Sequence, residues 1–248
     1  MKRVLYILAL FALGFYACSK DQPEAEKTYP EEVAFVYGGE TVTCQVIKKT
    51  YTRDSAGNPL SEPVTKLWLD RNLGATRAAV AYNDSMASGD LCQWGRLADG
   101  HQKRDSDTTE QLSAGIVPGH DHFIASPLIS DDWLVVSDDS LWNGSDNTNC
   151  SCPEGWRVPT AGELAMEMNS WTPQNMDGAY ASTLKWVASG NRDNHGTERY
   201  SEYWSFIWSS TPATHQDAYV LAIPGSLPAE IISSGRIYGL VVRCIRDY

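Results

Sequence analysis

A long central stretch without apolar periodicity limits the folds that this chain can adopt. Residues 84–155 are dominated by Gly, Ser, Asp and Asn, with scattered aromatic residues and no helical or strand-like repeat. A compact domain rarely contains so long an irregular segment unless the segment carries function or is held by crosslinks. We therefore expect extensive loops, and the fate of the six cysteines becomes the main structural question.

Short regular elements are predicted on both sides of this stretch. Thr160 and Glu163 have the spacing of a capping box, which predicts a helix over 161–171. The turn-forming residues 54–59 separate two runs that favour strands. Strands are predicted, from β-branched and apolar residues, at 33–37, 41–47, 64–70, 203–205, 218–221 and 237–244. Together these elements indicate an α+β fold.

The N-terminus has the pattern of an export signal. Lys2 and Arg3 precede an apolar run that is too short to span a bilayer comfortably, so residues 1–17 are predicted to be a cleaved leader. Cys18 follows at once in a loose lipobox, which predicts acylation of Cys18 and attachment to a membrane. The alternative is an ordinary signal peptide with a chance cysteine. Residues 19–21 resemble a surface-export tag, which favours a lipid-anchored protein of the outer membrane, exposed at the cell surface.

Composition divides the remaining chain and excludes one class of partner. Residues 18–32 are polar, acidic and Pro-containing, so we expect an acylated flexible tether. Residues 33–62 are predicted to be a β-rich annex, and residues 63–248 the main domain. The formal net charge of −11 repels phosphate backbones, so nucleic acid is not an expected partner.

Cys150 and Cys152 form a Cys-x-Cys pair, which raises the question of a metal or redox site. Zinc needs four N or S ligands and usually a second closely spaced pair, which the sequence lacks. Redox motifs typically have Cys-x-x-Cys spacing at a helix start. In an exported protein the ordinary fate of cysteine is a disulfide.

Five sequence blocks follow one another in a recognisable order: WLDRNLGA at 68–75, GDLCQWGR at 89–96, CPEGWRVPT at 152–160, YWS at 203–205 and VRCIRD at 242–247. This succession resembles the Fibrobacter succinogenes major paralogous domain family across residues 63–248. The resemblance implies a C-type-lectin-like fold with small antiparallel sheets, about two helices and long disulfide-pinned loops, in a module on bacterial surface proteins. It also implies a disulfide between Cys152 and Cys244.

Acylation of Cys18 leaves five cysteines, so at least one thiol remains unpaired in the monomer. Cys92 and Cys150 bracket the long loop and are the second candidate pair. That pairing would leave Cys44 free on a strand. A bridge between Cys44 and Cys92 is the alternative.

Aromatic and acidic residues in the long loop are the candidate ligand site. Trp133 and Trp142 fit no core periodicity, so they either stack on a glycan or grip a peptide, or pack in the loop. Nearby carboxylates are compatible with Ca²⁺, although solvated acidic loops are the simpler interpretation, and no other cofactor is expected. These candidate ligand carboxylates are Asp131, Asp132, Asp138 and Asp139, with Asp146 close by.

Catalysis is not expected. The segment 157–164 also resembles a block of formylglycine-generating enzymes, but their chemistry needs two neighbouring copper-binding cysteines near the C-terminus, where this chain has only Cys244. Arg157 is expected to satisfy carbonyls or to pair with a carboxylate. No nucleophile elbow, phosphate loop or zinc-protease motif occurs in the sequence.

The sequence therefore favours a non-enzymatic binding module for a glycan or protein ligand. The alternative is an accessory or tip subunit of a surface fibre, in which residues 33–47 would supply an exchangeable edge strand.

Overall fold

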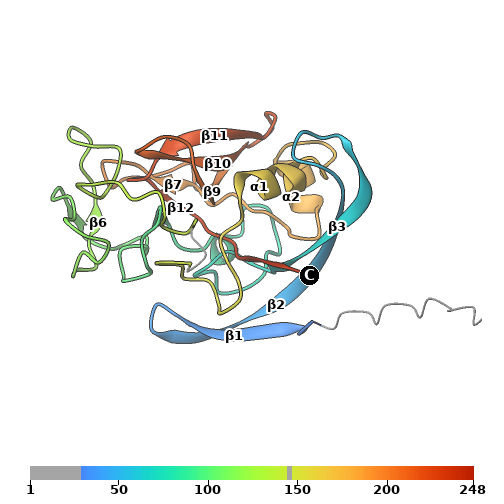
Figure 1. Cartoon of the computed structure of the whole chain (residues 1–248), viewed down its shortest axis with the longest axis horizontal. Helices are drawn as coiled ribbons and strands as arrows, with labels where there is room; N and C mark the ends of the chain where they lie inside the picture. Colours follow the sequence, from blue (N-terminus) through green and yellow to red (C-terminus); the bar gives the residue numbers. More distant parts are fainter. Residues whose placement is uncertain (1–28, 144–146) are drawn as a thin grey trace, which may run out of the picture.

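The computed structural model describes residues 29–143 and 147–248, so the predicted leader, Cys18 and most of the tether lie outside the described residues. Short antiparallel strands dominate, with two α-helices and one 3-10 turn in the described ranges, which is an α+β architecture (Figure 1). The helical elements are η1 (Ser85–Ala87), α1 (Ala161–Met168) and α2 (Met176–Ala181). None of the described helices is long and apolar enough to cross a membrane.

The first sheet joins the two ends of the described chain. Its order is β1-β2-β3-β13, and every neighbouring pair is antiparallel. Gly38 and Gly39 adopt positive φ angles of 56° and 87° and form the tight turn between the first two strands. The strands are β1 (Glu32–Tyr37), β2 (Glu40–Arg53), β3 (Pro59–Leu69) and β13 (Ile245–Asp247).

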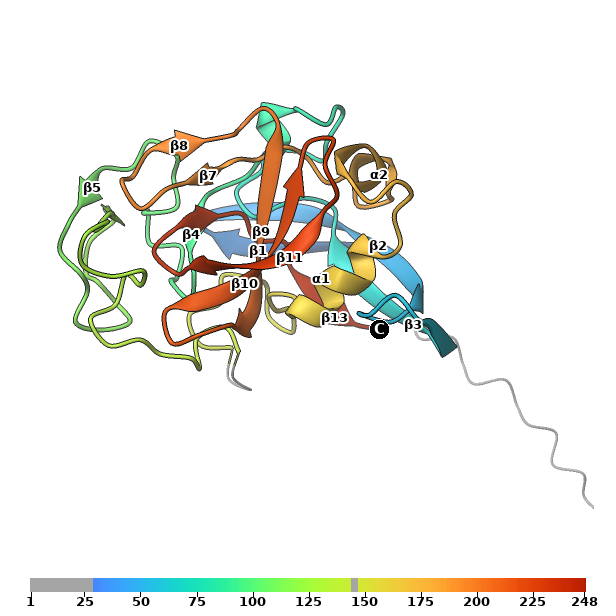
Figure 2. The same cartoon turned by 90° about the horizontal axis from the view of Figure 1, so that it is seen from above.

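Three further sheets complete the fold. One sheet has the order β11-β10-β9, a second has the order β4-β12-β7-β8, and β5 pairs with β6 in parallel. Helix α1 packs beside β10 and β11, whereas β5 and β6 lie at the opposite end of the molecule (Figures 1 and 2). These strands are β4 (Cys92–Gln93), β5 (Thr108–Thr109), β6 (Phe123–Ile124), β7 (Asn191–Arg192), β8 (Glu198–Arg199), β9 (Trp204–Pro212), β10 (Asp217–Pro224), β11 (Glu230–Gly235) and β12 (Gly239–Leu240).

Tryptophan and arginine together fill much of the interior. The Arg236 guanidinium lies 4.3 Å from the ring centre of Trp94, and that of Arg243 lies 4.2 Å from Trp186. Both arginines are about 1% exposed. A planar, weakly hydrated guanidinium tolerates burial when it stacks on an aromatic face and donates to nearby acceptors. Arg243, for example, donates to the Asn72 side chain and to the Leu184 carbonyl.

The predicted helix is confirmed but is shorter than expected. Thr160 accepts from the Glu163 amide while the Glu163 carboxylate accepts from the Thr160 amide, so the capping box is complete. The helix ends at Met168 instead of continuing to Trp171. Beyond Met168 the Ser170 and Trp171 amides bond to carbonyls three residues back instead of four, and the Trp171 indole donates to the buried Glu167 carboxylate.

The C-terminal strand prediction is confirmed only in part. Residues 237–244 do not form one strand: β12 ends at Leu240 and β13 begins at Ile245. The intervening residues pass through the core, where Val241 forms an isolated parallel bridge with Ile207 and Arg243 makes the buried contacts described above. Residues that contact several sheets at once cannot keep the hydrogen-bond register of a single ladder.

The predicted boundary between annex and main domain falls inside β3. The β1–β2 hairpin shares its sheet with β13, and Tyr37, Cys44 and Val46 enter the largest apolar cluster of the main body. Residues 33–62 are therefore part of the same packed structure as the residues that follow them.

The Cys152–Cys244 disulfide is confirmed, with an S–S distance of 2.07 Å and a Cα–Cα distance of 5.7 Å. The predicted Cys92–Cys150 bridge is wrong, and the alternative Cys44–Cys92 bridge is also absent, because all three thiols are free. Cys92 is buried in β4, where its sulfur lies 3.8 Å from the Tyr37 hydroxyl, whereas Cys150 lies half-buried in a loop. Burial raises the pKa of Cys44 to about 11 and that of Cys92 to about 12.

Candidate functional site

The two tryptophans predicted to meet a ligand belong to the core. Trp133 is fully buried and donates from its indole nitrogen to the Trp94 carbonyl at 2.7 Å. Trp142 is 4% exposed, donates to the Asn149 carbonyl at 2.9 Å, and its ring centre lies 5.9 Å from that of Trp94. The prediction that both rings offer open stacking faces is therefore wrong, and loop packing is the correct alternative.

The predicted Ca²⁺-binding carboxylates do not converge. Asp132 is buried, accepts from the Leu134 amide at 3.0 Å and lies 3.8 Å from Arg236. Asp139 pairs with the same arginine, and Asp138 accepts from Ser140. Asp131 is exposed and lies next to Gly235, while Asp146 lies outside the described residues. Across the described ranges, no three His, Cys, Asp or Glu side chains are arranged to hold a metal ion.

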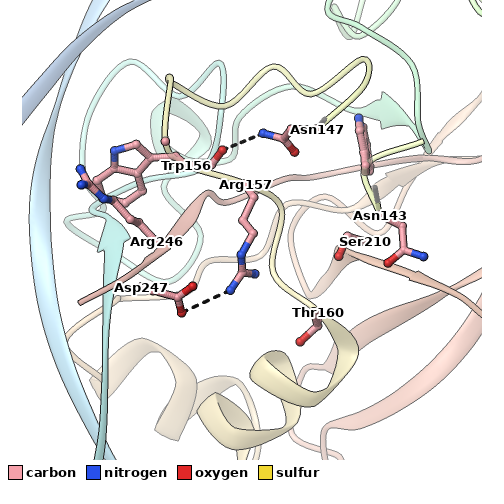
Figure 3. Close-up of a pocket in the computed structure, with 10 residues that line it drawn as sticks. Asn143, Asn147, Trp156, Arg157, Thr160, Ser210, Arg246 and Asp247 are labelled. Atoms are coloured by element: carbon pink, nitrogen blue, oxygen red, sulfur yellow. Dashed lines mark hydrogen bonds and ion pairs between the residues drawn. The ribbon is translucent and has the colours of Figure 1, made fainter. Parts of the chain in front are cut away.

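A cavity of about 490 Å³ with both polar and aromatic lining residues lies beside the start of α1 (Figure 3). Its walls come from the loop before the helix, from β9 and from β13. We call it the α1 cavity. The lining residues are Trp142, Asn143, Asn147, Gly155, Trp156, Arg157, Thr160, Ser210, Arg246 and Asp247.

The disulfide and one backbone bridge bring these distant segments together. Arg157 and Ile245 exchange backbone hydrogen bonds of 3.0 and 2.9 Å in an antiparallel bridge. The Cys152–Cys244 bond crosslinks the same two segments. The next residues of the C-terminal strand, Arg246 and Asp247, thereby line the cavity beside the pre-helix loop, where Asp247 faces Arg157 and Arg246 lies next to Trp156 (Figure 3).

Four charged side chains form a closed network on the helix side of the cavity. Arg157 donates to both Glu163 oxygens at 2.7 Å, and Lys66 lies 2.9 Å from the same carboxylate. Asp247 lies 3.5 Å from Arg157 and pairs with Lys66. Burial opposes ionisation of Glu163, but hydrogen bonds from Arg157 and Thr160 and the nearby cations lower its pKa to about 2. The carboxylate pairing predicted for Arg157 is confirmed.

Other lining groups remain available to a ligand. Arg246 and Asn143 are exposed, and Arg246 has no ion-pair partner in the part of the chain that the structure describes. Asn147 adopts φ 52° and donates to the Trp156 carbonyl at 2.8 Å, which leaves its amide oxygen unused by that bond. Guanidinium donors, amide donors and acceptors, and a carboxylate thus surround the cavity, with indole edges between them.

Sequence reasoning missed most of this site. Sequence patterns mark Trp142 as a candidate ligand contact and predict a structural role for Arg157. Asn147, Ser210 and Arg246 belong to no such pattern. Ser210 and Arg246 reach the cavity only because β9 and β13 pack against the pre-helix loop. The motif at 152–160 is the sequence feature that could have indicated the site, because it supplies several of the lining residues.

Comparisons with protein-family profiles, curated proteins and solved structures return no significant match to this chain.

Proposed function

We propose that this chain is a surface-exposed lipoprotein whose α1 cavity binds a glycan without catalysing a reaction. The observation that carries the proposal is the lining of that cavity, where amides, guanidinium groups and a carboxylate alternate with indole edges. Sugar hydroxyls are both donors and acceptors, so they are best matched by a wall that offers both kinds of partner.

The absence of a catalytic constellation among the lining residues supports a binding role. Among the described residues that line the α1 cavity there is no cysteine or histidine, so the hydroxyl groups of Thr160 and Ser210 have no imidazole base within that set. Cys244 is bonded to Cys152, so it is not a free thiolate of the kind that binds copper in formylglycine-generating enzymes. The resemblance to that enzyme block is explained by the Arg157–Glu163 pair and the helix cap.

A glycan array probed with the soluble chain from residue 19 tests the proposal. We expect binding to at least one glycan class, and we expect Arg246→Gln and Asn143→Ala to weaken it. Arg53→Gln is the matched control, because Arg53 is exposed on β2 outside the cavity. A wild-type chain that binds no glycan, or cavity variants that bind as the wild type does, would contradict the proposal.

The lipid anchor is tested separately. Cells that express the full chain and grow with labelled palmitate are expected to label the wild type but not Cys18→Ala. Protease treatment of intact cells should degrade the protein if it is displayed outside the outer membrane. Label that persists in Cys18→Ala, or full protection from protease, would contradict the anchor or the exposure respectively.

A fibre subunit is the second candidate function, favoured by one observation. β1 is an edge strand with β2 as its neighbour, and its side chains are mostly exposed or half-buried. Residues 33–47 are too long a segment to exchange, because β2 is central and contributes Cys44 and Val46 to the core. Deletion of 32–37 is therefore the sharper test: a fibre subunit should lose assembly, as judged by size-exclusion chromatography and electron microscopy, whereas a binding head should keep its ligand.

A further inference from the structure

Three aromatic rings, those of Tyr200, Trp204 and Phe206, pack together at the beginning of β9. The ring centres of Tyr200 and Trp204 are 5.3 Å apart with an interplanar angle of 28°. Those of Trp204 and Phe206 are 5.6 Å apart at 30°. The ring centres of Tyr200 and Phe206 are themselves 6.4 Å apart at 54°, so the three rings form a compact triangle, and Phe206 packs against the main apolar cluster.

Tyr200 is the most exposed of the three aromatic residues and has a strained backbone conformation. Its φ of 61° is unusual for a bulky L-residue, and 56% of the residue is exposed to solvent. Its carbonyl accepts from the amides of Tyr203 and Trp204, both at 3.1 Å. Gly190 lies against the preceding turn so closely that a Cβ there would meet the Arg199 carbonyl at 2.4 Å. Close packing on both sides of Tyr200 and two hydrogen bonds to its carbonyl therefore hold its backbone in place.

The exposed ring has the properties of a sugar-stacking surface. The Tyr200 ring contacts Trp204 and Phe206 on its inner side, and more than half of the residue remains exposed to solvent. The neighbouring Ser201 and Glu202 are exposed polar side chains. A pyranose has an apolar C–H face and polar edges, so it matches one flat ring with a hydrogen-bonding rim. A protein interface of ordinary size would need a much larger contiguous surface of about 800 Å².

We propose that Tyr200 is the stacking face of a second glycan-contact site. It is separate from the α1 cavity, since Trp204 and Ser210 lie six residues apart on β9, or about 20 Å along an extended strand. The inference does not depend on ligand binding in the α1 cavity, because none of the three aromatic residues lines that cavity.

Substitutions at one position can separate binding from folding. Glycine adopts positive φ without strain, so this relief offsets part of the lost ring contacts, and Tyr200→Gly should remain folded with only a small change in unfolding temperature. Tyr200→Phe keeps the ring and should keep binding. Tyr82→Ala is the matched control, because Tyr82 is 45% exposed and has no stacked partner in the described structure.

The experiment uses the soluble chain from residue 19 and three soluble probes: the hexasaccharides of glucose, xylose and N-acetylglucosamine. Saturation-transfer NMR and tryptophan fluorescence report binding near the ring. We expect at least one probe to bind, and Tyr200→Gly to weaken that binding about five- to tenfold. Tyr200→Phe, Tyr82→Ala and the cavity variant Arg246→Gln should leave this signal unchanged.

Three results would overturn the inference: no probe binds the wild type, Tyr200→Gly binds as the wild type does, or Arg246→Gln abolishes the signal that Tyr200→Gly spares. The last result would support the α1 cavity as a glycan site and would contradict only the proposed site at Tyr200. A loss of binding in Tyr200→Gly with only a small change in unfolding temperature is the supporting result.

Discussion

Glu163 makes the wall of the α1 cavity sensitive to acid. Its side chain is 11% exposed and accepts hydrogen bonds from both terminal nitrogens of Arg157 and from the Thr160 amide, with Lys66 2.9 Å away. Burial raises its pKa, but these donors and cations outweigh that effect and lower the pKa from 4.5 to about 2. The perturbation is Glu163→Gln, which keeps the side-chain shape and removes the charge.

The size and sign of the effect follow from the two pKa values. A carboxyl group that ionises near 4.5 when unfolded and near 2 when folded adds about 3 kcal/mol to the free energy of unfolding at neutral pH. The pKa of Glu163 is lower in the folded state than in the unfolded state. This contribution to the free energy of unfolding is therefore fully present above the unfolded pKa of 4.5 and declines as the pH falls below it. It is lost below about pH 2.

Urea unfolding followed by tryptophan fluorescence measures this contribution over a series of pH values. The difference in unfolding free energy between wild type and Glu163→Gln should be largest at neutral pH and should shrink by about 3 kcal/mol on acidification. Glu110→Gln, at an exposed position, should show a small difference at every pH. A wild-type-to-Glu163→Gln difference that stays constant from neutral to acidic pH would refute the reasoning.

Three further predictions concern the core and its sulfur atoms. Replacing Cys152 with Ser and Cys244 with Ala opens a loop of 92 residues and should lower the free energy of unfolding by about 4 kcal/mol. Urea titrations measure this loss, and a value below about 1 kcal/mol would contradict a stabilising role for the disulfide. Trp133→Ala should destabilise the fold by about 3–5 kcal/mol, as thermal unfolding would reveal, and a stable variant with selective loss of ligand would restore the ligand hypothesis. Native protein should leave Cys44 and Cys92 unlabelled by a thiol reagent until urea is added, as read by peptide mapping, because burial raises the pKa of both thiols; rapid labelling of either one in the native state would count against this burial.

Local pattern determined the elements that depend on neighbouring residues. The capping box at Thr160 and Glu163 works through a three-residue spacing, so the helix start was predictable. The Gly38–Gly39 turn and its flanking β-branched runs likewise specify a hairpin. The resemblance to a family of crosslinked surface domains pointed to the Cys152–Cys244 pair, which the structure contains.

Tertiary structure alone decided which aromatic residues meet solvent. Trp133 and Tyr200 both lie in loop-like sequence, yet the first is fully buried and the second is 56% exposed. Burial depends on segments that pack from elsewhere in the chain. The Trp94 ring, for example, lies 5.9 Å from that of Trp142, and no local repeat encodes such a contact.

The α1 cavity shows the same division. Its pre-helix wall is continuous in sequence and was marked by a motif, but Ser210 and Arg246 come from strands that are remote along the chain. Arg246 meets that wall because a disulfide and one backbone bridge fasten β13 to it, and Ser210 meets it because its amide donates to the Pro159 carbonyl at 2.8 Å. Sequence by itself determined the short elements, since these follow from local hydrogen bonding, whereas the Cys152–Cys244 pair was expected only from the family resemblance. The site needed the folded structure, because chemical groups distant in sequence become neighbours only when the sheets pack.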